Sequence, residues 1–148
     1  MKPRPTPLEA AAKALARRDR SAADLTAYLE RHGTAPDDAG HAVARLEEAG
    51  YVDDARYAAR RAEILAGRGY GDDAVRFELE RDGVGADEIE VAVASLAPER
   101  ERALTFLRGA KTPLAAVRRL AGKGFSADAL ESALAAAPDG EMPDPDAR

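Results

Sequence analysis

The chain of 148 residues contains no cysteine and no tryptophan, and only two histidines. Without cysteine it can form no disulfide, no thiol nucleophile and no cysteine-ligated zinc site. Aromatic residues make up 5% of the chain against 45% hydrophobic residues, so a core must be built from Ala, Leu and Val. No apolar run approaches the roughly 18–20 residues of a membrane helix, and no apolar segment follows the basic N-terminus as in a signal peptide. We therefore expect a cytoplasmic protein without membrane contact.

The charge is unevenly distributed along the chain, with a formal net charge of −5. Residues 1–23 hold six basic and two acidic side chains (+4), and residues 24–96 hold eight and 17 (−9). Residues 97–124 hold seven and two (+5), and residues 125–148 hold one and six (−5). A strongly basic nucleic-acid binder is not described by this balance, although local basic patches can form in the first and last thirds.

The sequence repeats itself three times. The segments 21–46, 71–96 and 112–137 align, and Gly33, Gly83 and Gly124 coincide in them. Apolar residues recur at spacings of three and four, which is the period of a helix. We therefore predict nine helices, near residues 7–18, 21–32, 36–49, 54–66, 71–82, 86–96, 98–108, 112–122 and 126–136.

The ends of these predicted helices carry the expected residues. Each aligned glycine follows a helical run, where a left-handed backbone favours glycine. Prolines stand at helix starts, and Thr6 with Glu9 forms a capping-box pattern, while Thr112 precedes Pro113 as a predicted cap. The sequence thus predicts an all-α fold, a tandem array of three three-helix repeats that is elongated or curved. Its predicted divisions are a disordered N-terminus 1–6, repeats 7–52, 53–97 and 98–137, and a disordered acidic tail 138–148.

Several features resemble catalytic or metal sites but are better explained by structure. Acid pairs occur four times, each at a predicted helix start, where carboxylates complement the helix dipole. His32 and His41 are nine residues apart, which is not the spacing of a helical metal pair. The glycines in "AGRGYG" (66–71) do not match a phosphate-binding loop. We predict that the chain is not an enzyme and holds no cofactor and no metal.

The segment "GYVDDARYA" (50–58) is predicted to be a joint between the first two repeats. Gly50 should end one helix, Asp53 should cap the next, and Asp54 should add charge to its first turn. Tyr51 and Tyr57 are expected to pack across this joint.

Basic side chains cluster in three places, near the junction of a first and a second helix or on a second helix. If the repeats stack regularly, they form one stripe that can bind phosphates or an acidic protein surface. A solvated helical face is the alternative, and the sequence leaves both open. The stripe candidates are Arg17, Arg18, Arg20, Arg60, Arg61, Arg68, Arg118, Arg119 and Lys123.

Four stretches resemble the RecX regulatory protein family. They are "LARRDRSAADLTAYLERHG" followed by "AVARLEEAGYVDDARYAARRAEI", then "GRGYGDDAVRFELERDGV", then "LAGKGFSADALESAL". The resemblance runs from about Leu8 to Ala136 and implies repeated three-helix units. It also implies a non-enzymatic modulator that binds the RecA–single-stranded-DNA filament and mostly inhibits the recombinase in DNA repair, recombination and the SOS response. The chain departs from the family pattern at Asp82, where Lys or Arg often precedes the glycine.

Two alternatives to this resemblance remain. A helix-turn-helix-like protein would bind naked DNA directly with a steep salt dependence. A helical scaffold would bind an unrelated protein. For the first interpretation we expect the RecA filament as partner, weak contact with single-stranded DNA, no small-molecule substrate and a monomeric chain.

Overall fold

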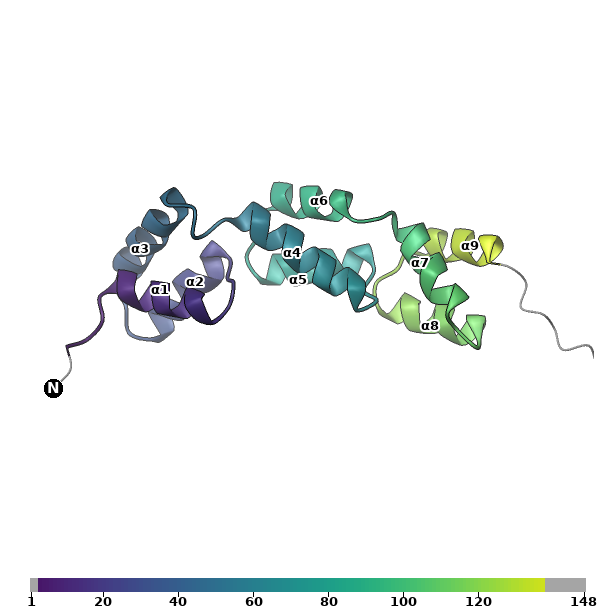
Figure 1. The fold of residues 1–148 in the computed structure, drawn as a ribbon, viewed down its shortest axis with the longest axis horizontal. Coiled ribbons are helices and arrows are strands. Elements are labelled where there is room, and N and C mark those ends of the chain that lie inside the picture. The colour runs from purple at the N-terminus through teal and green to yellow at the C-terminus, as the bar shows by residue number, and fades with distance from the viewer. Residues whose placement is uncertain (1–2, 138–148) are drawn as a thin grey trace, which may run out of the picture. The chain divides into compact units, whose positions relative to one another are not determined.

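The computed structural model describes residues 3–137, and these form α-helices without any strand (Figure 1). Each helix begins and ends within one residue of its predicted bounds, and the all-α helical repeat fold is confirmed. The tail predicted at 138–148 and the first two residues of the predicted N-terminal segment lie outside the described residues. The helices are α1 (Pro7–Arg17), α2 (Ala22–Arg31), α3 (Pro36–Glu48), α4 (Asp54–Gly67), α5 (Asp72–Arg81), α6 (Ala86–Ser95), α7 (Glu99–Arg108), α8 (Pro113–Gly122) and α9 (Ala127–Ala136).

The chain divides into two compact units. Unit 1 comprises the described residues up to Ile64 together with Arg76–Ser95, and unit 2 comprises Leu65–Val75 with the described residues from Leu96 onward. Helices α4 and α5 therefore each contribute to both units. The predicted repeat boundaries at 52/53 and 97/98 stay a prediction.

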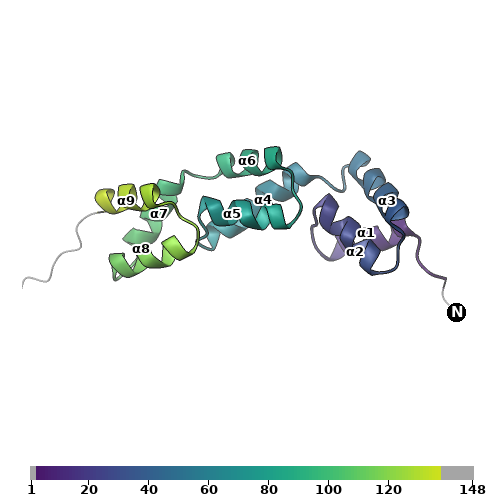
Figure 2. The same cartoon turned by 180° about the vertical axis from the view of Figure 1, so that it is seen from behind.

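In unit 1, α1, α2 and α3 contact one another around a small apolar core (Figures 1 and 2). Leu25 and Leu29 of α2 are fully buried there. Ala11 and Ala14 of α1 lie against them, and their small side chains let the helices approach closely. Each buried leucine stabilises the fold by about 2 kcal/mol relative to an exposed one, so α2 is the central element of this group.

In unit 2, α7, α8 and α9 form a second group of three mutually contacting helices. Leu107, Leu120 and Leu130 contribute one buried residue from each helix. Phe125, in the α8–α9 turn, joins this core and meets the Phe106 ring edge to face at 6.5 Å between centroids. The two aromatic rings add apolar area to a core otherwise built from leucine and alanine.

Local signals set the helix ends. Thr6 accepts a hydrogen bond from the Glu9 amide at 3.2 Å, as its capping pattern predicts. The glycines that align in the sequence adopt positive φ angles, for example +94° at Gly33. The prediction for Thr112 is wrong in one respect: it stands at the N-cap of α8, but its side chain accepts no capping bond. Its backbone, at φ −127° and ψ 95°, departs from that of Thr6 at −64° and 159°, and this places the hydroxyl differently.

Each unit contains one contact in which a side chain at the start of a later helix bonds to the backbone at the start of an earlier helix, and we call this contact a joint. In unit 1, the Ala22 amide at the start of α2 donates to the Asp54 carboxylate at 2.8 Å. In unit 2, the Asp72 amide at the start of α5 donates to the Glu99 carboxylate at 3.2 Å. A first-turn acid of one helix thus caps the start of an earlier helix, which gives the acids a role beyond their own helix dipole.

A glycine turn completes each joint. In unit 1 Gly83 lies so close to Ala23 that a Cβ at position 83 would overlap the alanine side chain. In unit 2 a Cβ at Gly124 would lie 2.6 Å from the backbone nitrogen of Ala74. Both glycines also have positive φ, at +79° and +90°. Gly83 and Gly124 are therefore required both by backbone conformation and by close approach of the helices.

Candidate functional site

Three of the predicted stripe residues come together in unit 1. Arg18 follows α1, and Arg60 and Arg61 lie on α4. They line one open pocket of about 390 Å³. Its other lining residues are Asp19, Tyr57, Ile64 and Asp82. Two segments separated by some 40 residues thus contribute to one cationic surface, which we call the arginine pocket.

The three arginines differ in how far their charge is already neutralised. Arg61 is half-buried and forms long ion pairs with Glu78 at 3.9 Å and Asp82 at 3.8 Å. Arg18 contacts Asp24 at 3.4 Å but keeps 56% of its side chain exposed. Arg60 is exposed, and the described residues provide it with no ion pair. Arg60 therefore carries the charge most available to a partner.

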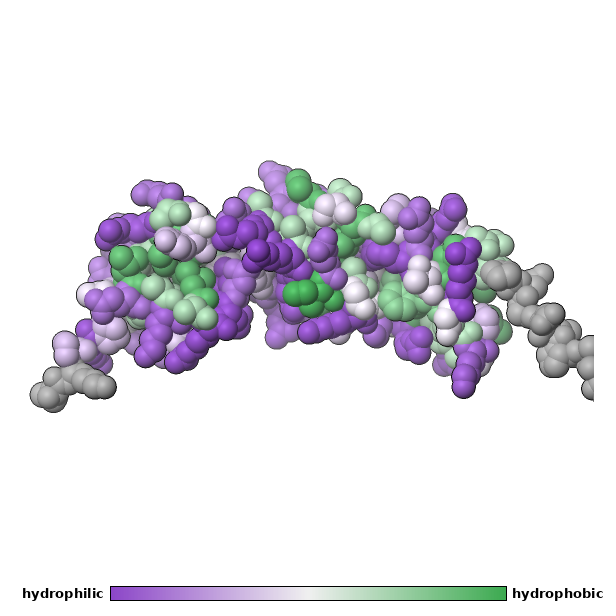
Figure 3. Space-filling model, viewed as in Figure 1, coloured by the Kyte–Doolittle hydropathy of each residue, from purple (hydrophilic) through white to green (hydrophobic). Residues whose placement is uncertain are grey.

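An apolar groove of about 840 Å³ continues from the arginine pocket and shares Arg18, Asp19 and Arg60 with it. Figure 3 shows apolar side chains gathered over α1 on this face. The apolar lining, which we call the α1 groove, consists of Leu8, Ala12, Leu15, Ala16, Leu46 and Tyr51. An apolar centre with a charged rim is the composition of a protein-binding surface.

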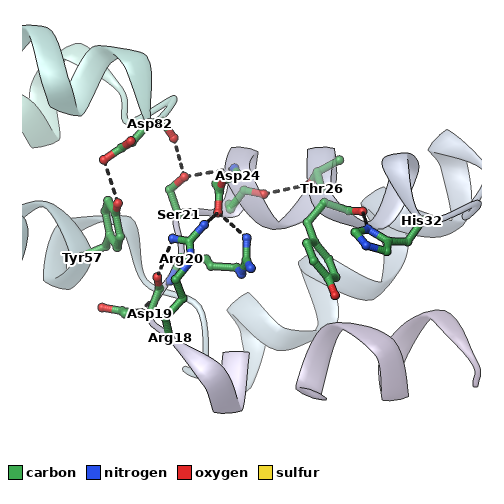
Figure 4. A network of polar contacts seen from close by, with 11 residues as sticks. Arg18, Asp19, Arg20, Ser21, Asp24, Thr26, His32, Tyr57 and Asp82 are labelled. Carbon is green, nitrogen blue, oxygen red and sulfur yellow. Dashed lines mark hydrogen bonds and ion pairs between the residues drawn. The ribbon is translucent and has the colours of Figure 1, made fainter. Parts of the chain in front are cut away.

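Arg20 does not belong to a surface stripe, which corrects the prediction made for it. Its side chain is buried, with 7% of the residue exposed. It pairs with Asp24 at 2.9 Å (Figure 4) and covers the Tyr28 ring, with its central carbon 4.4 Å from the ring centroid. Its apolar stem and planar head fill space beside α2, and no local sequence pattern predicts this burial.

The remaining stripe candidates are distributed over other surfaces. Arg17 lines a third pocket of unit 1, considered below. In unit 2, the Lys123 ammonium donates to the Arg68 carbonyl at 3.0 Å and lies 5.4 Å from the Tyr70 ring centroid. Arg119 lines a small pocket of about 350 Å³ at the start of α8, and Arg118 is exposed. Lys123 is thus engaged within unit 2, whereas both arginines of α8 are available.

Asp82, which marks the departure from the family pattern, bonds to two side chains in unit 1, those of Tyr57 and Ser21 (Figure 4). Its carboxylate accepts a hydrogen bond from the Tyr57 hydroxyl at 2.7 Å, and its carbonyl accepts one from the Ser21 hydroxyl. Burial and this hydrogen bond raise the pKa of Tyr57 above its ordinary value of 10.0. The aspartate is therefore a structural anchor, a role that no local pattern predicts because Ser21 lies 61 residues away.

The segment 50–58 behaves mostly as predicted. Gly50 has a φ of +82°, and Asp53 accepts a capping bond from the Arg56 amide at 3.0 Å. Tyr57 is buried, with 8% exposed, but Tyr51 is 68% exposed. The expectation that Tyr51 packs in the joint is wrong, because the next residue, Val52, at 3% exposed, occupies the core instead. Tyr51 is thereby left on the surface, where it borders the α1 groove.

Residues 3–137 offer neither a metal-binding cluster nor a membrane-spanning helix. That part of the chain holds no group of three His, Asp or Glu side chains placed to bind a metal ion. Nor does it hold a helix with the length and apolar character required to cross a bilayer.

The chain resembles known proteins along most of its length. Residues 8–46 match the sequence family described as RecX, first three-helix domain. A Regulatory protein RecX from Stenotrophomonas maltophilia (strain R551-3) is 36% identical over 144 residues, covering 90% of this chain and 88% of the relative. A Regulatory protein RecX from Xanthomonas oryzae pv. oryzae (strain MAFF 311018) is 35% identical over 138 residues, covering 86% of each chain.

Solved structures agree on the fold. The crystal structure of RecX from Lactobacillus salivarius superposes with a TM-score of 0.74 at 15% identity, over 88% of this chain and 93% of that chain. A second crystal structure of a regulatory protein RecX gives 0.74 at 20% identity, over 87% and 71%. The structures show the shared fold, and the sequence relatives show that the chain belongs to the RecX family of regulatory proteins.

Proposed function

We propose that this chain is a non-enzymatic cytoplasmic regulator that binds the RecA–single-stranded-DNA filament and limits recombinase activity in DNA repair and recombination. The observation that carries the proposal is the 36% identity to a Regulatory protein RecX over 90% of this chain. The surface chemistry supports the same direction, because the α1 groove and the arginine pocket combine apolar and cationic groups as protein-binding surfaces do.

The proposed contact has two parts. Apolar side chains of the partner bury against the α1 groove, where Leu8 and Leu15 are only partly covered. Acidic side chains of the partner pair with Arg60 and Arg18 at the rim. A rim charge of this kind contributes mainly to association rate and specificity, and the apolar centre contributes most of the affinity.

The tandem arrangement of three-helix repeats adds to this contact in the proposal. A filament presents the same surface on successive protomers, and an array of repeats can engage more than one of them. Weak contacts made by one chain add through effective concentration. The acidic net charge of −5 also disfavours strong binding to naked DNA, so we expect the effect to require the recombinase.

The decisive experiment is a RecA ATPase assay on single-stranded DNA, with and without this chain at a substoichiometric ratio. We expect the chain to lower the steady-state ATPase rate, since each bound chain acts on several protomers of the filament. An unchanged rate at ratios up to equimolar, together with no co-sedimentation with the filament, would overturn the proposal. A steeply salt-dependent affinity for naked DNA without any RecA effect would instead favour a direct DNA-binding protein.

A further inference from the structure

A third pocket of unit 1, of about 480 Å³, carries a concentration of cationic side chains. Arg4, Lys13 and Arg17 line it, with Asp38 as the opposing acid among the lining residues. All three cations are exposed, and within residues 3–137 none of them forms an ion pair. The pocket therefore has an excess of positive charge that the rest of the described chain does not neutralise.

A planar stack forms one wall of the same pocket. The His32 ring lies on the Tyr28 ring, with 4.1 Å between centroids and 28° between planes. The buried Arg20 guanidinium also contacts the Tyr28 ring, 4.4 Å from its centroid. His32 Nδ1 is also 2.8 Å from the Tyr28 carbonyl oxygen, which fixes the orientation of the imidazole. Arg20 and the Tyr28 carbonyl thus hold the two rings in place, while His32 itself is exposed and lines the pocket.

This combination distinguishes the pocket from an ordinary solvated helix face. A helix-end histidine that only complements the dipole needs no ring stack and no surrounding cations. An acidic peptide would use the cations and leave the exposed ring face without a partner. A nucleotide uses both, since its base stacks on an aromatic face and its phosphate binds Lys and Arg.

We propose that this pocket holds one nucleotide of single-stranded DNA, with the base stacked on His32 and the phosphate bound by Lys13 and Arg17. The choice of DNA as the ligand rests on the proposed function, which brings the chain to a filament that contains single-stranded DNA. The pocket supplies a local contact with base and phosphate even though the chain as a whole is acidic.

The test measures fluorescence anisotropy of a labelled oligo(dT) titrated with the full chain at low salt, without RecA. His32→Ala removes the stacking face, and we expect it to weaken binding at least about fivefold, since one stacked base contributes roughly 1–3 kcal/mol. His32→Phe keeps an aromatic face and should retain most of the affinity. His41→Ala is the matched control, because His41 is also an exposed histidine but lines none of the pockets described above.

An oligonucleotide of abasic sites separates stacking from simple charge attraction. With it we expect His32→Ala to have no effect, whereas Lys13→Glu with Arg17→Glu should still weaken binding. Competition by ATP distinguishes a free nucleotide from a polynucleotide: displacement of oligo(dT) by ATP at concentrations near the oligonucleotide's own Kd would overturn the assignment to DNA.

Two further results would also overturn it: no binding of oligo(dT) by the wild-type chain, or equal affinities for His32→Ala and His41→Ala. Circular dichroism of each variant excludes loss of fold as the cause. The RecA ATPase assay separates this inference from the proposed function. A chain that slows RecA but does not bind oligo(dT) contradicts the pocket alone, and a chain that binds oligo(dT) but leaves RecA unaffected contradicts the proposed function alone.

Discussion

At the scale of single residues, the two joints place different side chains at corresponding positions. Tyr57 lies three residues after Asp54, and Arg102 lies three residues after Glu99. Tyr57 donates to Asp82 in unit 1, whereas in unit 2 the residue aligned with Asp82 is Lys123. Arg102 bonds instead to the Asp72 carboxylate at 2.8 Å and to the Tyr70 carbonyl at 3.1 Å. The joints therefore share their backbone pattern and differ in the polar pair that fixes each one.

Replacing Tyr57 by Phe tests the polar pair of unit 1. The variant keeps the buried ring but removes the donor to Asp82, so we expect the free energy of unfolding to fall by about 1–2 kcal/mol. Urea unfolding followed by circular dichroism measures the change. Tyr51→Phe is the matched control and should stay within about 0.5 kcal/mol of wild type, because that ring is 68% exposed. Equal stabilities of the two variants would show that the Tyr57 hydroxyl contributes nothing.

The raised pKa of Tyr57 predicts how this difference changes with pH. Because the pKa is higher in the folded state than the ordinary value of 10.0, the stabilisation is fully present below pH 10. It is lost as the pH rises above 10, where tyrosinate forms in the unfolded chain first. We therefore expect the stability gap between wild type and Tyr57→Phe to be smaller at about pH 11 than at about pH 8. A gap that stays constant or widens over that range would contradict the assignment.

The residue roles that could be predicted from sequence are those set by near neighbours. Asp53 accepts a capping hydrogen bond from an amide three residues later, and Gly50, with its positive φ, comes directly after a helical run. Asp82 and Arg20 could not be placed in the same way. Tyr57 and Ser21, which bond to Asp82, are 25 and 61 residues away from it, and the burial of Arg20 depends on the packing of Tyr28 beside it.

At the scale of helices, both joints need a backbone N–H on the first residue of the helix that stands second in its predicted repeat, α2 or α5. Ala22 and Asp72 supply that donor in units 1 and 2. The corresponding helix of the last predicted repeat, α8, begins with Pro113, which has no N–H. The first residue of α8 therefore has no backbone N–H that could donate to a carboxylate in the way that Ala22 and Asp72 do. The backbone contact of the two joints is therefore not reproduced at the start of α8, and the monomeric state stays a prediction.

Glu99→Ala tests the carboxylate that fixes the joint of unit 2. This side chain accepts bonds from the amides of Asp72 and Ser126 and from the Ser126 hydroxyl, at 3.1–3.2 Å. Its removal leaves the starts of α5 and α9 without this acceptor, and we expect a loss of about 1–3 kcal/mol in unfolding free energy. Amide hydrogen exchange should accelerate at Asp72 and Ser126.

Glu101→Ala is the control for this variant, because Glu101 is also in the first turn of α7 but is exposed and makes no side-chain hydrogen bond in the described part of the chain. It should cost only a few tenths of a kcal/mol through the helix dipole. If exchange at Asp72 and Ser126 were unchanged in Glu99→Ala, the capping role of Glu99 would be wrong.

The helices themselves were predictable to within a residue because three local signals agree. Apolar periodicity, first-turn acids and glycine turns all mark the same boundaries, for example at the α2 end near Gly33. The sharing of α4 and α5 between the two units was not predictable. Both helices have the same local signals as the others, and which unit each turn joins depends on contacts distant in sequence.

At the scale of the whole molecule, the structure reduces the number of basic side chains available for partners. Arg20 is buried and Lys123 bonds within unit 2, so neither offers a free charge. Arg61 is partly neutralised by two acids. Unit 1 still presents Arg18 and Arg60 beside an apolar groove, and the positions of basic residues in the sequence do not indicate this arrangement. A single stripe along all the repeats stays a prediction, while the surface of unit 1 defines a site that can be tested separately.

Reversing the charge of Arg60 tests whether this surface acts on the recombinase. Arg60→Glu removes an exposed cation without breaking an ion pair of the described residues, so the fold should be retained. We expect at least about a threefold higher concentration to be needed for half-maximal inhibition of the RecA ATPase, because a rim charge typically contributes about 1 kcal/mol or less and its reversal adds repulsion.

Arg45→Glu is the matched control: it reverses another exposed arginine of unit 1, on α3, that lines none of the pockets described. If both variants inhibit like wild type, the arginine pocket does not contact the filament. If both weaken equally, net charge rather than this surface is responsible, since each variant changes the formal net charge from −5 by the same amount.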